Sequence, residues 1–239
     1  AAQTRAIDSL QRVIVEHAGD TLALKARLNL IFELSRKDSQ KAKSYSYQVI
    51  KLATAMHRIK ELQGAYAYLV TLHQNSGSLD SAQYYLTLLE KTSKENPNNV
   101  SVALTYYQTT GLFYKNLGQY NQALPFMLKA LNLNAGENEN HAGQLLNVGN
   151  TYFNLGDLKN AARFHLRSLE MFEKLNNKRG QSFCLNSLGN DFFKLNQFDQ
   201  AAPYFHRSVK LKQELQDKRG LISSWTGLGD VYKEKGQFQ

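Results

Sequence analysis

The chain has 239 residues, of which 42% are hydrophobic, 11% aromatic and 21% charged, with three prolines. So many aromatic residues exclude a disordered chain, because their burial offsets the entropy lost on ordering. No linker rich in proline or glycine divides the sequence, so we expect one folded body over residues 1–239. No apolar run approaches the roughly 18 residues that a membrane-spanning helix needs.

The chain is basic, with a net charge of +9. Such an excess is compatible with nucleic acid, an anionic membrane or an acidic partner. The basic residues are scattered among acidic ones, however, so we expect a solvated helical surface, no nucleic acid and no membrane contact by this segment. Cys184 is the only cysteine, which excludes an internal disulfide and leaves the compartment open between the cytoplasm and an extracytoplasmic space.

One pattern recurs four times from residue 110 onward. Each copy has a glycine among apolar residues, a glycine or asparagine seven residues later, and an apolar residue two positions further on. The first glycines are Gly111, Gly149, Gly189 and Gly229, spaced 38, 40 and 40 residues apart. The second positions are Gly118, Gly156, Asn196 and Gly236, followed by Tyr120, Leu158, Phe198 and Phe238. Alanine comes next at Ala123, Ala161 and Ala201. This order at a fixed period indicates a repeat protein.

The same pattern extends toward the N-terminus in a weaker form. One earlier copy consists of Val70, Gly77, Leu79 and Ala82, and the weakest consists of Leu30, Lys37 and Ala42. Before them, Ile7, Leu10 and Ile14 space an apolar face over a leading helix near residues 4–17. We therefore expect that helix, repeats over 20–57, 59–97, 98–136, 138–176 and 178–216, and a half repeat over 218–239.

Each repeat has the pattern of two helices. Phe164, Leu169, Phe172 and Leu175 illustrate the spacing of apolar residues, which is helical rather than strand-like. The glycine or asparagine between the halves supplies the left-handed residue that ends the first helix. The glycine of the first helix and the alanine of the second predict a close helix crossing, because small side chains let two backbones approach.

These features resemble the tetratricopeptide repeat family. The family pattern also includes the aromatic residues Tyr114, Tyr152, Phe192 and Tyr232, and Trp225 stands where an early tryptophan is common. The resemblance implies an all-α, right-handed superhelical α-α solenoid. The period of about 40 residues exceeds the usual 34, and we expect the extra residues to lengthen the second helix, through 170–175 and 212–215. Such long repeats are similar to those of peptide-binding polarity adaptors and of bacterial sensor and regulatory proteins.

We find no pattern that indicates catalysis. The six histidines include no pair at the spacing of three or four that places two metal ligands on one helix face. His165 is expected to be a satisfied core histidine and Cys184 a buried, inert thiol. Two basic pairs are expected in the closing turns of two repeats, where they face solvent: Lys178-Arg179 and Lys218-Arg219. We therefore expect no enzyme, no metal and no cofactor.

Asparagines gather around the repeat glycines and give the candidate site. In the resembled architecture the first helix of each repeat lines the concave groove, which implies a ligand-binding set of Asn147, Asn150, Asn154, Asn186, Asn190, Lys194, Lys115, Asn116 and Asp230. Asparagine is a mediocre helix former, and its amide can both donate to and accept from a peptide unit. In the adaptors, asparagines matching Asn150 and Asn190 hold peptide ligands. Alternatively, these asparagines bond one another and stiffen the stack, or face solvent.

The expected function is a non-catalytic module that binds a protein or peptide in the groove. We expect it to be the sensing or scaffolding part of a larger bacterial signalling protein, because the pattern breaks off inside a repeat at Gln239. The alternative is a regulatory segment of an enzyme, such as a sensor histidine kinase, whose catalytic domain lies outside this chain. The partner and the oligomeric state stay open.

Overall fold

The computed structural model describes residues 2–134 and 136–236, and in these residues it contains twelve helices and no strand. The helices are α1 Ala2–Glu16, α2 Thr21–Leu34, α3 Ser39–Ala55, α4 Ile59–Asn75, α5 Leu79–Glu95, α6 Val100–Asn116, α7 Tyr120–Leu133, α8 Glu139–Asn154, α9 Leu158–Lys174, α10 Lys178–Lys194, α11 Phe198–Glu214 and α12 Lys218–Glu234. None of the described helices is long and apolar enough to span a bilayer. Beyond α1, the even-numbered helices are the first helices of the expected repeats and the odd-numbered ones are the second.

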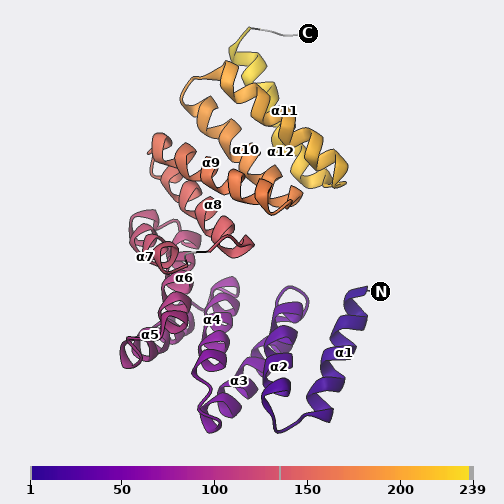
Figure 1. Ribbon diagram of the computed structural model, residues 1–239, viewed down its shortest axis with the longest axis vertical. Helices are drawn as coiled ribbons and strands as arrows, with labels where there is room; N and C mark the ends of the chain where they lie inside the picture. The colour runs from indigo at the N-terminus through magenta and orange to yellow at the C-terminus, as the bar shows by residue number, and fades with distance from the viewer. Residues whose placement is uncertain (1, 135, 237–239) are drawn as a thin grey trace. The chain divides into compact units, whose positions relative to one another are not determined.

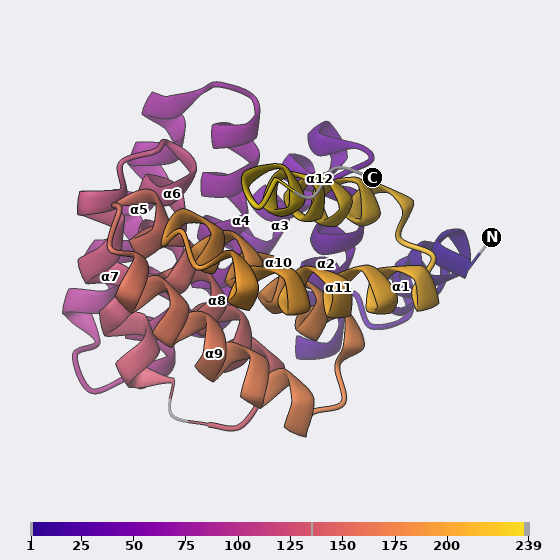
Figure 2. The ribbon, with the colours of Figure 1, turned by 90° about the horizontal axis from the view of Figure 1, so that it is seen from above.

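The helices group into two compact units, Ala1–Leu117 and Gly118–Gln239, here called unit 1 and unit 2. In unit 1, each helix from α1 to α6 packs against the next along the chain, and α4 also contacts α2 and α6 (Figure 1). In unit 2, the helices from α7 to α12 pack in the same successive way. The first helix α10 also contacts both α8 and α12, and it lies between them in the view from above (Figure 2).

The turns inside the repeats contain left-handed residues. Gly77, Gly118, Gly156, Asn196 and Gly236 have φ of 74°, 73°, 80°, 58° and 65°. The predicted left-handed end of the first helix is therefore confirmed at these positions. The four glycines have no Cβ to clash with the following carbonyl, and asparagine is the residue other than glycine that is sometimes found there. Lys37, from the weakest copy, does not have a positive φ, and Phe238 lies outside the described residues.

Apolar side chains at the predicted spacing form the core between the helices. Phe164, Leu169 and Phe172 on α9 are all buried, and Leu169 and Phe172 pack with Leu185 and Leu188 of α10. Complete burial of each such side chain contributes about 1.5–3 kcal/mol. In unit 2 this packing fixes the register between successive first and second helices.

The predicted close crossing within a repeat is present, and an aromatic ring takes part in it. A Cβ added at Gly149 would overlap the ring of His165, and one at Gly189 would lie 2.7 Å from the ring of Phe205. Ala161 and Ala201, one turn earlier on the second helices, are fully buried. The small residues thus make room for a ring against the backbone of the first helix.

The second helices α9 and α11 run through residues 170–174 and 212–214, where the extra residues were expected, and the first helix α10 has the same length of 17 residues. One detail of the sequence-based expectation is wrong. The basic pairs at 178–179 and 218–219 lie in the first turns of α10 and α12 rather than in closing turns. Asn177 and Asp217 cap those helices, because their side chains accept from the backbone N–H groups three residues later.

Candidate functional site

The predicted site residues fall in both units. Lys115 and Asn116 end α6 in unit 1, whereas the other seven lie on the first helices of unit 2. These seven are here called the asparagine face: Asn147, Asn150 and Asn154 on α8, Asn186, Asn190 and Lys194 on α10, and Asp230 on α12. Spacings of three, four and eight residues place the members of each helix on one side of it.

In unit 1, Asn116 takes part in a link between α6 and α4. Its Nδ2 donates to Gln74 Oε1 at 3.3 Å, and Gln74 Nε2 donates to the carbonyl oxygen of Phe113 at 2.9 Å. Burial lowers the pKa of the neighbouring Lys115. Asn116 therefore stabilises the contact between these two helices.

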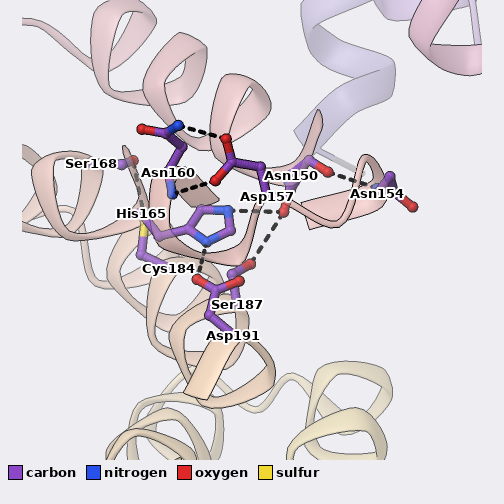
Figure 3. Close-up of polar contacts among 9 residues, drawn as sticks. All are labelled: Asn150, Asn154, Asp157, Asn160, His165, Ser168, Cys184, Ser187 and Asp191. Atoms are coloured by element: carbon purple, nitrogen blue, oxygen red, sulfur yellow. Dashed lines mark hydrogen bonds and ion pairs between the residues drawn. The ribbon is translucent and has the colours of Figure 1, made fainter. Parts of the chain in front are cut away.

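On α8, the side chain of Asn150 is held by the two following helices. His165 Nε2 on α9 lies 3.1 Å from Asn150 Oδ1, and Ser187 on α10 donates its hydroxyl to the same oxygen at 3.4 Å (Figure 3). Asn150 Nδ2 has no hydrogen-bond partner in the described part of the chain, and it is not among the buried unpaired atoms there. Its N–H groups are therefore accessible while its oxygen is engaged.

Behind Asn150, His165 forms a buried pair with Asp191 of α10. His165 Nδ1 lies 2.6 Å from Asp191 Oδ2, and the two side chains are 1% and 0% exposed. Burial raises the pKa of Asp191, and the facing His165 opposes that rise. Asp191 Oδ1 is buried without a hydrogen-bond partner in the described residues. The prediction that His165 is a satisfied core histidine is confirmed.

On α10, the side chain of Asn186 is held in a similar way by a buried lysine. Lys212 on α11 is 1% exposed, and its Nζ donates to Asn186 Oδ1 at 3.3 Å, to Ser224 Oγ at 2.8 Å and to the Gly220 carbonyl at 3.1 Å. Ser224 and Ser223 on α12 also donate to Asn186 Oδ1, at 2.7 and 3.3 Å. The oxygen of Asn186 is thus surrounded by donors.

Three of the remaining members of the asparagine face, Asn190, Lys194 and Asp230, are less constrained by the fold. Asn154 Nδ2 donates to the backbone oxygen of Asn150 at 2.7 Å, and Asn147 is half-buried. Asn190 is also half-buried, yet its side chain has no hydrogen bond in residues 136–236 of unit 2. Lys194 and Asp230 are exposed there and belong to none of its ion pairs. The side chains of Asn190, Lys194 and Asp230 are therefore available to solvent or to a ligand.

The sequence did not single out Asp191 and Lys212, although the repeat contains a signal for both. Forty residues away, Thr151 and Val231 occupy the place of Asp191, and Phe172 occupies that of Lys212. Charged residues at positions that are uncharged in neighbouring repeats mark a local polar network, because a buried charge needs partners.

Two buried polar side chains, Cys184 and His165, are enclosed within the fold. Burial raises the pKa of Cys184 to about 12, so its thiolate is not formed near neutral pH. Both ring nitrogens of His165 face partners inside the fold. Among the described residues no group of three or more histidine, cysteine or acidic side chains is placed to hold a metal ion.

Comparisons with known proteins agree with this architecture. Residues 104–137 and 140–214 each match a tetratricopeptide repeat model, and a comparison with curated sequences gives no match. The fold is similar to BtubC (BKLC) from P. vanneervenii, with a TM-score of 0.74 and 23% identity over 90% of this chain and 93% of that one.

Two further solved structures are also similar. The apo form of RapI has a TM-score of 0.75 and 14% identity, over 90% of this chain and 61% of that one. A STAND-type signal transduction ATPase with a tetratricopeptide repeat sensor, from Pyrococcus horikoshii, has a TM-score of 0.70 and 17% identity, over 95% of this chain and 36% of that one. At such identities the likeness shows the fold. The fold is an all-α solenoid of tetratricopeptide repeats, a kind of fold that serves protein interaction.

Proposed function

We propose that the chain is a non-catalytic module that binds an extended segment of a partner protein along the asparagine face of unit 2. In this proposal the module is the sensing or scaffolding part of a larger signalling or regulatory protein of a bacterium. The similarity to a structure described as an ATPase with a tetratricopeptide repeat sensor supports the regulatory role. It also supports the alternative that an enzymatic domain outside this chain is the one regulated.

The observation that carries the proposal is the set of amide groups on neighbouring first helices. Asn150 and Asn186 each turn an N–H group away from the internal network, and Asn190 has no internal partner in the described residues. The helices that bear them, α8 and α10, are in contact. Amides at this spacing can hydrogen-bond acceptor groups of a bound segment, on its main chain or its side chains.

The test is selection of peptides from a displayed library of random dodecapeptides on the purified chain. Wild-type protein should enrich a set of peptides, and Asn190→Ala should weaken their affinity about tenfold, because one or two hydrogen bonds are lost. Asn190 is the informative position, since its removal breaks no internal hydrogen bond. Asn121→Ala, at an exposed position on α7, is the matched control.

Two outcomes would contradict the proposed function. One is a selection that enriches no peptide on the wild-type chain. The other is a set of peptides whose affinity is the same for Asn190→Ala and for wild type. Circular dichroism of each variant verifies that the helical content is retained, so that a loss of binding is not a loss of fold.

A further inference from the structure

Resting on the proposed function, we infer that buried His165 and Lys212 are positioning residues that decide what the asparagine face accepts. They hold the oxygens of Asn150 and Asn186 inward and leave only N–H groups outward. The partner segment is therefore acidic, with aspartate or glutamate side chains as the acceptors.

Both ring nitrogens of His165 face side chains inside the fold. Nδ1 faces the Asp191 carboxyl and Nε2 faces Asn150 Oδ1. If Nδ1 carried the only ring hydrogen, a neutral histidine would leave Asp191 as an uncompensated charge at a site that is 0% exposed, which is costly. We take the pair as neutral overall, either as imidazolium with carboxylate or as imidazole whose Nδ1 accepts a hydrogen bond from the protonated Oδ2 of Asp191. In both forms Nε2 carries a hydrogen.

The hydrogen on Nε2 of His165 determines the orientation of the side-chain amide of Asn150. A donor at Nε2 requires an acceptor opposite, so the side-chain oxygen of Asn150 must face inward, where the Ser187 hydroxyl also donates to it. The NH₂ group is then directed away from the network. Asn150 can donate to a ligand through its side chain, and its oxygen is already occupied.

Lys212 orients the side-chain amide of Asn186 in the same way. An ammonium group has donors and no acceptor, so Lys212 Nζ must face the oxygen of Asn186. The hydroxyls of Ser223 and Ser224 donate to that oxygen as well. Asn186 Nδ2 has no partner in the described residues and is not among their buried unpaired atoms. Two neighbouring first helices thus present the same kind of group.

The surrounding charges favour carboxylates over neutral acceptors. Lys194 on α10 and Lys233 on α12 are exposed and form no ion pair within the described part of unit 2. Asp230 is the one acidic member of the asparagine face. A surface that combines outward N–H groups with unpaired ammonium groups matches an acidic segment, because hydrogen bonds to a charged acceptor are the stronger ones.

The first arm of the experiment tests the ligand class with the tightest dodecapeptide from the display selection. It is synthesised with a fluorescent label as selected, and again with every aspartate and glutamate replaced by asparagine and glutamine. We expect the acidic form to bind at least tenfold more tightly in 0.15 M salt. Equal affinities, or a selected peptide without acidic residues, would overturn this inference and leave the proposed function standing. A selection with no peptide overturns the proposed function itself.

The second arm tests the positioning role through a substitution that the chain itself suggests. Phe205 and Val231 stand forty residues beyond His165 and Asp191 and pack in one hydrophobic cluster. The double variant His165→Phe with Asp191→Val replaces both residues by those of the next repeat. It removes the hydrogen bond from His165 and so allows the amide of Asn150 to rotate. The preference for the acidic over the amidated peptide should fall to below threefold, with the amidated form bound as before. A merely structural role would leave this preference unchanged.

A third variant guards against a folding defect in the double variant. Asn150→Asp keeps an oxygen for His165 and Ser187 but replaces the outward NH₂ by a carboxylate oxygen. The acidic peptide should bind at least tenfold more weakly to it, whereas Asn121→Asp, with the same charge change on α7, should bind as wild type does. Unaltered binding by Asn150→Asp would contradict the inference.

Discussion

Asn150 and Asn190 occupy the same place in successive repeats, but only Asn150 is held by the second helix of its own repeat. His165 Nε2 lies 3.1 Å from Asn150 Oδ1, whereas the residue that faces Gly189 from α11 is Phe205, which has no polar atom to offer. The amide of Asn150 is thereby oriented and that of Asn190 is free to turn. The two asparagines that the sequence made equivalent differ in what they can present to a ligand.

The buried pair of His165 and Asp191 should behave as a unit in unfolding experiments. Either single substitution, His165→Phe or Asp191→Val, leaves one polar partner buried and unpaired, so the free energy of unfolding should fall by about 3–5 kcal/mol. The double variant removes both groups and should recover to within about 1 kcal/mol of wild type or exceed it. Urea unfolding of the four proteins measures this coupling. A double variant as unstable as the worse single variant would refute it.

The glycines of the first helices should differ in their response to alanine. Gly149→Ala brings a Cβ against the His165 ring, and overpacking of this kind should cost about 1–3 kcal/mol. Gly229→Ala meets no atom within 4 Å, so it should stabilise the protein by about 0.5–1 kcal/mol through helix propensity. Thermal unfolding of both variants checks the sign of each effect. Similar shifts at the two positions would contradict the predicted close crossing at Gly149.

Lys212 should make stability depend on pH in the alkaline range. Burial lowers its pKa from 10.5, with Asp217 opposing the shift. Between that lowered value and 10.5 the unfolded chain binds more protons than the folded one, so the free energy of unfolding rises with pH there. This contribution is complete above 10.5 and is lost as pH falls through the folded pKa. Lys212→Met should remove the rise, and Lys210→Met, exposed on the same helix, should keep it.

A glycine should be favoured at Gln216, which has a left-handed backbone with φ of 55° between α11 and α12. A residue with a Cβ is strained there by roughly 1–2 kcal/mol. Gln216→Gly should therefore stabilise the protein by about 0.5–1 kcal/mol, once the greater freedom of glycine in the unfolded chain is subtracted. Gln213→Gly, inside α11, should instead destabilise by about 1 kcal/mol. Denaturant midpoints of the pair give the test.

The helix pairs and their turns could be predicted from the sequence because they depend on local features. Gly156 and Asn196 are recognisable as left-handed residues, and Phe164, Leu169 and Phe172 show the helical spacing of a buried face. Because the same pattern recurs at matching positions of several repeats, each copy strengthens the prediction made for the others. The same local logic failed at the basic pairs of residues 178–179 and 218–219, where the capping side chain comes before the pair and starts a helix.

The hydrogen bonds that hold the candidate site from inside could not be predicted from the sequence, although Lys212 stands out as a charged residue at a position that is uncharged in the preceding repeat. Asn150 and Asn186 were found by their position beside the repeat glycines, but their bonds to His165 and Lys212 join residues 15 and 26 apart. Such bonds depend on which ring or ammonium group fills the space between two helices. The two expected roles, binding a ligand and stiffening the stack, are compatible, since one amide can direct its oxygen inward and its N–H groups outward.

The most direct test of ligand binding at the asparagine face is an NMR titration with the selected acidic peptide. The side-chain NH₂ signals of Asn150, Asn186 and Asn190 in ¹⁵N-labelled protein report on the groups that the account assigns to the ligand. It predicts that these three signals shift together and saturate at one peptide per chain, while that of Asn121 stays in place. Binding that leaves the three signals unmoved would contradict the account.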